Sequence, residues 1–349
     1  MKTKLKNIVD RFIVPQRDKP KVFNGEIPWC RIEDIEGKYL AKSLTDKNVS
    51  ESTIQEMNLK VFPIGTIIFS CSATIGVSAI TTAPLCTNQT FIGIVTSKNI
   101  DTEYLYYYLS CIGSDLKKSA TITTIAYLSK GFFENLEIEV PQSLHSQKQI
   151  SSSLKVIDEK IQINKNINHQ LSELERLIYN YWFIQLDFPN NEGKPYKSSG
   201  GKMVYSNELK REIPEGWKTE LITKSCSIVD CLHSKKPDQS KDTENKFLLQ
   251  LNHIKDDGLI DLSSKYFVKH HDYLEWTKRI EVEDGDVIIT NAGRVAATAQ
   301  VPKGLRTGIG RNITAIRPHS ISPTYLYLSF RGEDFRRQIK WNTDTGSFF

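Results

Sequence analysis

The sequence predicts an α/β protein in which two repeated mixed α/β domains are joined by one long coiled-coil-type helix. Two observations carry this prediction. Short segments recur in the same order at an offset of 216 to 221 residues, and an internal repeat of this size defines the architecture of a chain. Between the two copies, residues 143–185 contain no proline or glycine. A length of 349 residues suits two domains.

Four pairs of segments carry the repeat. They keep the same order in both copies, and their offset drifts by only five residues, which is hard to obtain by chance. The pairs are Lys2–Leu5 with Lys218–Leu221, Gly65–Ser70 with Gly285–Thr290, Ile94–Val95 with Ala315–Ile316, and Tyr104–Tyr106 with Tyr325–Tyr327.

Each copy is expected to contain a buried strand, a loop of small residues and a tyrosine-rich helix. Short β-branched runs that open after glycine are typical of strands. The expected strands are Thr66–Phe69, Val287–Thr290 and Leu136–Val140, the loops Ser72–Gly76 and Ala292–Ala296, and the helices Glu103–Cys111 and Thr324–Phe330.

The long helix is predicted from apolar residues that recur at steps of three and four, which form one narrow seam. A single six-residue step, with Asn164 in the gap, interrupts the spacing. A helix of about 40 residues is a rod of roughly 60 Å. Such a rod cannot bury its seam against one small domain, so we expect a partner helix. The seam residues are Ile150, Leu154, Ile157, Ile161, Ile167, Leu171, Leu174, Ile178 and Tyr181.

These features predict four regions: a first domain over 1–141, the helix over 142–186, a linker over 187–213 and a second domain over 214–349. The linker is expected because proline, glycine, serine and asparagine dominate it. The second copy stops at the equivalent of Leu128. We therefore expect it to be incomplete and to lack a second long helix.

Composition narrows the class of protein. Lysine and arginine number 46 against 41 acidic residues, a net charge of +5 that permits a DNA partner without requiring one. No apolar stretch is long enough for a membrane helix, and the six cysteines are too sparse for a disulfide framework. The sequence predicts a reduced, cytoplasmic protein that does not enter a membrane.

At this point the residues resemble a known family, the DNA-specificity subunits of type I restriction–modification systems. The resemblance covers essentially the whole chain. The segments that carry it are Ile27–Trp29, Gly65–Ser70, Leu136–Pro141 leading into Gln147–Ile150, and the tract from Asp187 to Trp217.

The resemblance implies that the two repeats are target recognition domains, each reading one half of a bipartite site in double-stranded DNA. It implies that the long helix acts as a spacer that recruits methyltransferase subunits, and that a restriction subunit can join the complex. By this resemblance the chain performs no chemistry itself. Because one rod is missing, we expect the helix to pair in trans within a homodimer.

The DNA-binding residues are predicted from two patterns. Base edges are read by polar side chains, and lysine and arginine contact phosphates. The matched loops carry different polar residues, as two readers of different half-sites require. The candidates are Ser70, Ser72, Thr74, Asn291 and Arg294 in the loops, and Arg17, Lys19, Lys21, Lys117, Lys118, Lys235, Lys236, Arg306, Arg311 and Lys340 for phosphate.

Two other classes of function stay open. An unrecognised stand-alone nuclease or methyltransferase would need a catalytic site, and Asp238, Glu244 and Lys246 form only a weak nuclease-like pattern. A zinc site at Cys226, Cys231 and His233 would lack a second pair of ligands. We therefore expect neither a metal nor a cofactor. A protein-interaction scaffold without a DNA role is the remaining alternative, for which the rod alone suffices.

Overall fold

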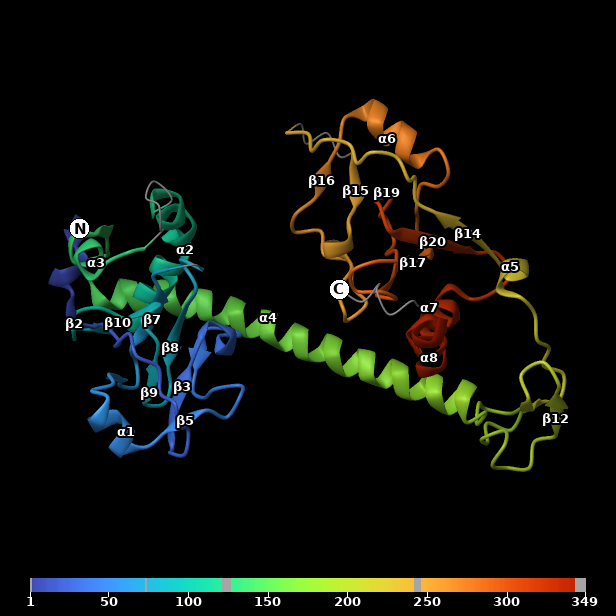
Figure 1. The fold of residues 1–349 in the computed structure, drawn as a ribbon, viewed down its shortest axis with the longest axis horizontal. Helices are drawn as coiled ribbons and strands as arrows, with labels where there is room; N and C mark the ends of the chain where they lie inside the picture. Colours follow the sequence, from blue (N-terminus) through green and yellow to red (C-terminus); the bar gives the residue numbers. More distant parts are fainter. Residues whose placement is uncertain (1, 73, 121–126, 242–245, 343–349) are drawn as a thin grey trace. The chain divides into compact units, whose positions relative to one another are not determined.

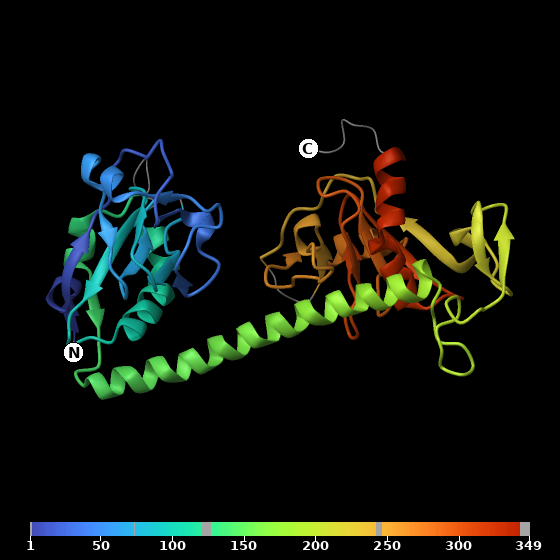
Figure 2. The same ribbon diagram turned by 90° about the horizontal axis from the view of Figure 1, so that it is seen from below.

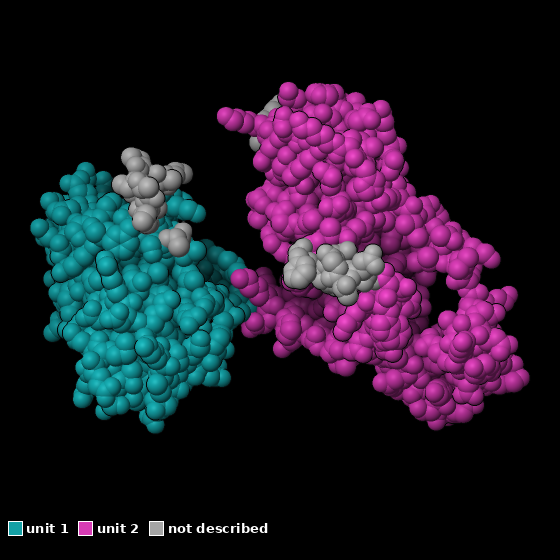
Figure 3. Space-filling model, viewed as in Figure 1, with its two compact units in different colours: residues 1–163 teal, residues 164–349 magenta. Residues whose placement is uncertain are grey.

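The computed structural model describes residues 2–72, 74–120, 127–241 and 246–342. The chain divides into two compact units, residues 1–163 and 164–349 (Figure 3). The division falls inside the long helix α4 (Leu144–Tyr179), so each unit holds one α/β repeat and one part of that helix. The expected fold class is confirmed.

The first unit is built around two sheets. The larger sheet has the strand order β2 (Val9–Ile13), β10 (Phe91–Thr96), β7 (Ile67–Ser70), β8 (Ser78–Thr81) and β4 (Tyr39–Leu40). The smaller sheet has the order β5 (Asn48–Val49), β3 (Ile27–Cys30), β9 (Leu85–Thr87) and β6 (Val61–Phe62). Helix α2 (Thr102–Ala120) packs on the face of the larger sheet that the smaller sheet leaves open (Figure 1).

This layering buries the central strand β7 on both faces. Ile67 and Phe69 pack with Leu105 of α2, whereas Ile68 packs with Leu85 of the smaller sheet. A strand that is covered on both faces needs an uninterrupted apolar run. The segment that the sequence singled out after Gly65 supplies that run.

The second unit repeats the arrangement. Its larger sheet has the order β14 (Cys226–Asp230), β20 (Ile313–Pro318), β17 (Val287–Thr290) and β18 (Thr298–Gln300), and its smaller sheet the order β16 (Tyr266–Phe267), β15 (Phe247–Leu249) and β19 (Gly308–Ile309). In both units two neighbouring strands of the smaller sheet run parallel, β3 with β9 and β15 with β19. The internal repeat is therefore a repeat of topology.

The strand register corrects one detail of the sequence alignment. Ile94 lies opposite Ile67, and Ile316 lies opposite Val287. Since Ile67 and Val287 occupy matching places, Ile94 corresponds to Ile316 and not to Ala315. The predicted pairing was wrong by one residue, because an apolar run aligns almost equally well after a shift of one, although such a shift exchanges the faces of a strand.

The helix that follows the larger sheet is continuous in the first unit and broken in the second. There, α7 (Pro323–Arg331) gives way at Gly332 to α8 (Glu333–Asn342). Gly76 has a φ of 101°, and a Cβ built on it would lie 3.1 Å from the backbone of Gly113 in α2. In the second unit Ala296 takes the place of Gly76. Its methyl group removes the room for the same close approach, which explains why the helix does not run on.

The predicted long helix is confirmed. Helix α4 continues past Tyr179 as a π-helical turn, η3 (Asn180–Ile184) (Figure 2). In the first unit α4 meets the repeat through polar side chains, and Gln147 and Ser151 are buried there. In the second unit Tyr179 is buried, and its hydroxyl lies 3.3 Å from the hydroxyl of Ser329.

The apolar seam of α4 is not used in these contacts. All nine predicted seam residues remain between 36% and 56% exposed. Three further apolar side chains of the helix, Val156, Ile163 and Leu177, are exposed beside them. In the second unit Leu171, Leu174 and Ile178 line a hollow together with Leu259 and Tyr327 of the repeat, so this part of the seam faces the repeat and is still partly exposed.

The segment after α4 is ordered by aromatic stacking. Phe188 stacks on Tyr196 at 4.8 Å and on Trp217 at 5.2 Å between ring centroids. The carboxylate of Asp187 accepts hydrogen bonds from the backbone and the hydroxyl of Ser198. The strands β12 (Met203–Ser206) and β13 (Arg211–Pro214) pair as a hairpin. Proline and glycine, which suggested a linker, here shape turns between these contacts.

The remaining elements are short. In the first unit they are β1 (Lys2–Lys4), η1 (Leu5–Asn7), η2 (Ile32–Asp34), α1 (Glu51–Glu56), α3 (Lys130–Asn135) and β11 (Glu137–Glu139), and in the second α5 (Ile222–Ser225), η4 (Leu251–His253) and α6 (His270–Thr277). The six cysteines are unpaired. None of the helices in the described ranges combines the length and the hydrophobicity needed to cross a bilayer.

Candidate nucleic-acid interface

The loops that follow β7 and β17 are closed by matching backbone hydrogen bonds. The amide of Ser70 donates to the carbonyl of Val77, and the amide of Thr290 donates to that of Ala297, at 2.8 and 3.0 Å. A second pair of bonds returns from Gly76 to Ser70 and from Ala296 to Thr290. The same frame therefore presents different side chains in the two units.

In the first unit this loop borders a hollow of about 240 Å³. The predicted contacts Lys19, Ser72 and Thr74 line it, together with five residues that were not predicted: Arg31, Ile32, Glu33, Asn88 and Thr90. Ser72 forms an isolated β-bridge with Tyr127, and Arg17 is exposed. Ser70 is fully buried and bonds to the carbonyl of Ser72, so it shapes the loop.

In the second unit the loop borders a basic hollow of about 570 Å³. Arg294 lies there with Arg336 and Lys340 of α8, opposite Asp256. The guanidinium of Arg294 donates to the Asp256 carboxylate at 2.6 Å and to the carbonyl of Ile254. Arg294 is thus held by intramolecular partners, although its side chain is 45% exposed.

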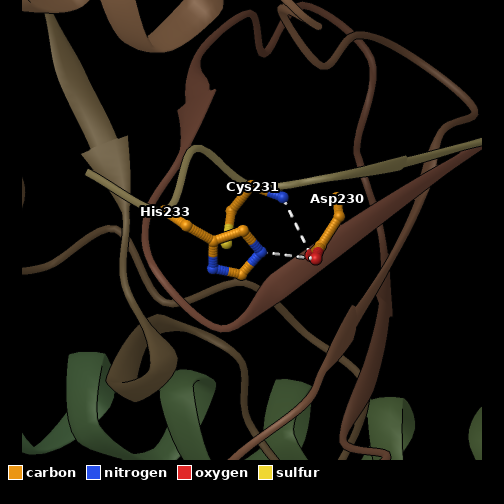
Figure 4. Close-up of side chains that lie close together, drawn as sticks. All are labelled: Asp230, Cys231 and His233. Atoms are coloured by element: carbon orange, nitrogen blue, oxygen red, sulfur yellow. Dashed lines mark hydrogen bonds and ion pairs between the residues drawn. The ribbon is translucent and has the colours of Figure 1, made fainter.

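A hydrogen-bond network centred on Asp230 adjoins this loop. One carboxylate oxygen accepts bonds from the Cys231 amide at 2.9 Å, the Thr314 hydroxyl at 3.0 Å and the Asn291 amide at 3.3 Å. The other oxygen lies 2.8 Å from Nε2 of His233 (Figure 4). Partial burial of Asp230 raises the pKa of its carboxyl, but bonds from His233, Thr314 and the Cys231 amide outweigh burial and lower it overall.

The zinc site considered from the sequence is not assembled. Cys226 packs among Val287 and Ile316 at the start of β14, whereas Cys231 packs in a separate core beyond its end. Asp230, Cys231 and His233 do place three donor atoms within 4.8 Å of one another. However, the Cys231 sulfur is buried and accepts a bond from the Asn312 amide, and Asp230 is saturated with donors. The nuclease-like pattern consists of Asp238, Glu244 and Lys246. Its second carboxylate, Glu244, lies outside the residues that the structure describes.

A comparison with known protein families finds a match to most of the first unit. Residues 12–173 match the family described as "Type I restriction modification DNA specificity domain". Over these residues the chain is similar to a type I specificity domain. The match covers most of the first repeat and most of α4, and it leaves out the tract from Asp187 to Trp217 that the sequence resemblance also included.

Several curated relatives of this specificity domain are similar to the chain. The type I restriction enzyme MjaIX specificity subunit of Methanocaldococcus jannaschii is 31% identical over 211 residues, which cover 60% of this chain and 46% of that protein. The EcoprrI specificity subunit of Escherichia coli is 28% identical over 150 residues, covering 41% and 36%. The chain thus spans about half or less of the length of these relatives.

Among solved structures, the type I restriction–modification S subunit from M. genitalium is similar, with a TM-score of 0.49 and 13% identity. The comparison covers 98% of this chain and 79% of that one.

The other predicted phosphate contacts of the first unit and of the second unit are mostly exposed. Lys21, Lys117, Lys235 and Arg311 are exposed, and the ammonium of Lys236 lies 3.9 Å from the ring centre of Tyr266. Lys118 lies in α2, and its side chain is outside the described set. Arg306 pairs with Glu283 at 2.7 Å, before the start of β17, whereas the reading loop follows its end.

The residues that sequence reasoning missed come from other strands. Arg31 follows β3, and Asn88 and Thr90 precede β10, so they reach the hollow only through the parallel pairing of β3 with β9. Arg336 stands four residues before Lys340 on α8. Helical spacing relative to Lys340 was the one signal that could have pointed to it.

Proposed function

We propose that this chain is the DNA-recognition subunit of a type I restriction–modification complex and performs no chemistry itself. Each repeat reads one half of a bipartite site in double-stranded DNA, and α4 serves as the spacer and scaffold for methyltransferase subunits. A restriction subunit can then join. The regions 1–141, 142–186, 187–213 and 214–349 act as first reader, spacer, connection and second reader.

The observation that carries this proposal is the pair of loops after β7 and β17. The same two backbone hydrogen bonds close both loops, but Thr74 stands where the second loop has Arg294. Direct readout depends on which donors and acceptors a fixed scaffold presents to base edges. Two copies of one frame with different polar side chains are what a protein needs to recognise two different half-sites.

The charges around the loops support DNA as the ligand. Lys19 and Arg31 border the first hollow, where Glu33 pairs with Arg31 at 3.4 Å, and Arg294, Arg336 and Lys340 border the second beside Asp256. Phosphate contacts from such side chains set the register of a protein on a duplex, while the loop residues read bases. A scaffold that binds only proteins has no need of two such hollows.

The exposed seam of α4 supports pairing in trans with a second copy of the chain. Nine apolar side chains spaced at three and four residues form a coiled-coil seam, and each still exposes about half of its surface. Burying the exposed remainder against a partner helix contributes about 1 kcal/mol per residue. A homodimer would thus supply two spacer helices.

Expression of the chain with its methyltransferase subunit in a host without type I methylation tests the function. Sequencing of modified bases is expected to reveal one split motif that is absent when the methyltransferase is expressed alone. Methylation without a motif, or no methylation from a soluble complex, would refute the proposal.

Analytical ultracentrifugation of the purified chain tests the pairing. We expect a dimer at micromolar concentration, and we expect Ile157→Lys to shift it to monomer because a charge enters the seam. Ser152→Lys is the matched control, since Ser152 is exposed on the side of α4 away from Ile157. A wild-type chain that stays monomeric, or equal effects of the two variants, would contradict trans pairing.

A further inference from the structure

Asn291 is held in one orientation by the network around Asp230. It is the first residue after β17, and its side chain is exposed. Its amide nitrogen Nδ2 donates to the Thr314 hydroxyl at 2.8 Å and to the Asp230 carboxylate at 3.3 Å. Thr314 in turn donates its hydroxyl hydrogen to Asp230 at 3.0 Å, so its oxygen is left to accept from Asn291.

The chemistry of Asp230 fixes which end of the Asn291 amide faces outward. An ionised carboxylate only accepts hydrogen bonds, so the –NH₂ group of Asn291 must face Asp230 and Thr314. Among the described residues, no donor is recorded for the opposite atom, Oδ1. The exposed end of Asn291 is therefore an oriented acceptor.

We propose that Asn291 reads one base pair of the half-site contacted by the second repeat, its Oδ1 accepting a hydrogen bond from the exocyclic amino group of adenine or cytosine. This inference rests on the proposed function. In the major groove only adenine N6 and cytosine N4 present amino donors. Because its –NH₂ group is turned toward Asp230 and Thr314, Asn291 presents Oδ1 to the base.

Asp230 and Thr314 are positioning residues in this scheme. His233 engages the second oxygen of Asp230, which leaves the first oxygen to hold Thr314 and Asn291. The first repeat has no counterpart, because Cys71 stands at the matching place, is buried and directs its sulfur to the carbonyl of Phe69. The two readers thus differ in mechanism as well as in side chains.

Selection of binders from randomised DNA duplexes, with the full chain in its complex with the methyltransferase subunit, tests the inference. The wild type is expected to select a split motif with adenine or cytosine at one position of one half. Asn291→Ala is expected to reduce the preference at that position by about five- to tenfold and to leave the other half unchanged. An unchanged motif with Asn291→Ala overturns the inference.

Asp230→Asn tests whether the base preference depends on the orientation of the Asn291 amide and not only on the presence of Asn291. The new amide can donate to Asn291 Oδ1, so the Asn291 amide turns and presents its –NH₂ group instead. The preference is then expected to move toward guanine or thymine, which offer acceptors in the major groove. If Asp230→Asn keeps the wild-type preference, Asp230 does not set the orientation.

Two controls keep these outcomes distinct. Thr314→Ser retains the hydroxyl and is expected to retain the motif, and Asn207→Ala, in the exposed turn between β12 and β13, is expected to change nothing. If the wild type itself selects no motif, the proposed function fails. If the wild type selects a motif that Asn291→Ala leaves intact, only the reading role of Asn291 fails.

Discussion

The hydroxyl of Tyr107 in α2 donates a 2.6 Å hydrogen bond to the Asp158 carboxylate in α4. The same hydroxyl accepts a 3.0 Å bond from the ammonium of Lys38, whose side chain is only 8% exposed and pairs with Glu103 at 3.1 Å. These contacts fasten the first part of α4 to the first repeat. Helix α4 is therefore attached to the first repeat by polar bonds, while its apolar seam stays partly exposed.

Tyr107→Phe is expected to lower the free energy of unfolding of the first unit by about 1 to 2 kcal/mol. It removes a bond to a charged group and leaves a half-buried carboxylate short of one donor. Hydrogen exchange of peptides from α2 and from the first part of α4 measures this change. Tyr205→Phe, on an exposed tyrosine of β12, is the control. Equal protection in wild type and Tyr107→Phe would contradict the fastening role.

The stability of the first unit is expected to fall as the pH rises above about 10. Burial, followed by the bonds to Asp158 and Glu103, raises the pKa of Tyr107 and of Tyr39. Above the ordinary pKa of tyrosine the unfolded chain releases these protons, whereas the folded chain keeps them. The free energy of unfolding therefore falls as the pH rises. Urea unfolding between pH 8 and 11 measures the slope. Tyr107→Phe should make it shallower; an unchanged slope would exclude this linkage.

Arg294→Ala is expected to weaken DNA binding and to reduce the slope of log K against log salt by about 0.9. To contact a phosphate, Arg294 must break its ion pair with Asp256. The variant Asp256→Ala should therefore bind DNA more tightly than the wild type. Arg306→Ala is the comparison, since Arg306 pairs with Glu283 before the start of β17. Fluorescence anisotropy across a salt series measures all three. A lower affinity for Asp256→Ala would show that the ion pair supports the binding conformation.

Gly76→Ala is expected to cost the first unit about 2 to 4 kcal/mol. The added methyl group meets the Gly113 backbone in a conformation with positive φ. The reverse change, Ala296→Gly, is expected to alter the stability of the second unit by less than about 1 kcal/mol. Thermal unfolding of both variants measures the difference. Similar costs at the two sites would contradict the account of the broken helix.

The fold was largely predictable because its signals are periodic. The buried strands β7 and β17 show as apolar runs after Gly65 and Gly285, and α4 shows as a seam at steps of three and four. Such patterns depend on near neighbours in the sequence. The one-residue slip at Ile94 marks their limit, since register depends on pairing between strands.

The candidate site was predictable only in part because its contacts are long-range. The loop positions Thr74, Asn291 and Arg294 follow from the repeat, but the partner of Arg294 is 38 residues away and that of Asn291 is 61 residues away. Side-chain pairing across a sheet leaves no periodic trace in the sequence. Ser70 shows the converse, because a polar residue at a strand end proved to be buried.

The central claim is that the two repeats read two half-sites independently. Methylation mapping with Thr74→Val and with Asn291→Ala, each expressed with the methyltransferase subunit, tests it most directly. Thr74 is exposed in the first loop and Asn291 in the second. The account predicts a split motif in which each variant relaxes a different half and leaves the other intact. A contiguous motif, or both variants acting on the same half, would contradict it.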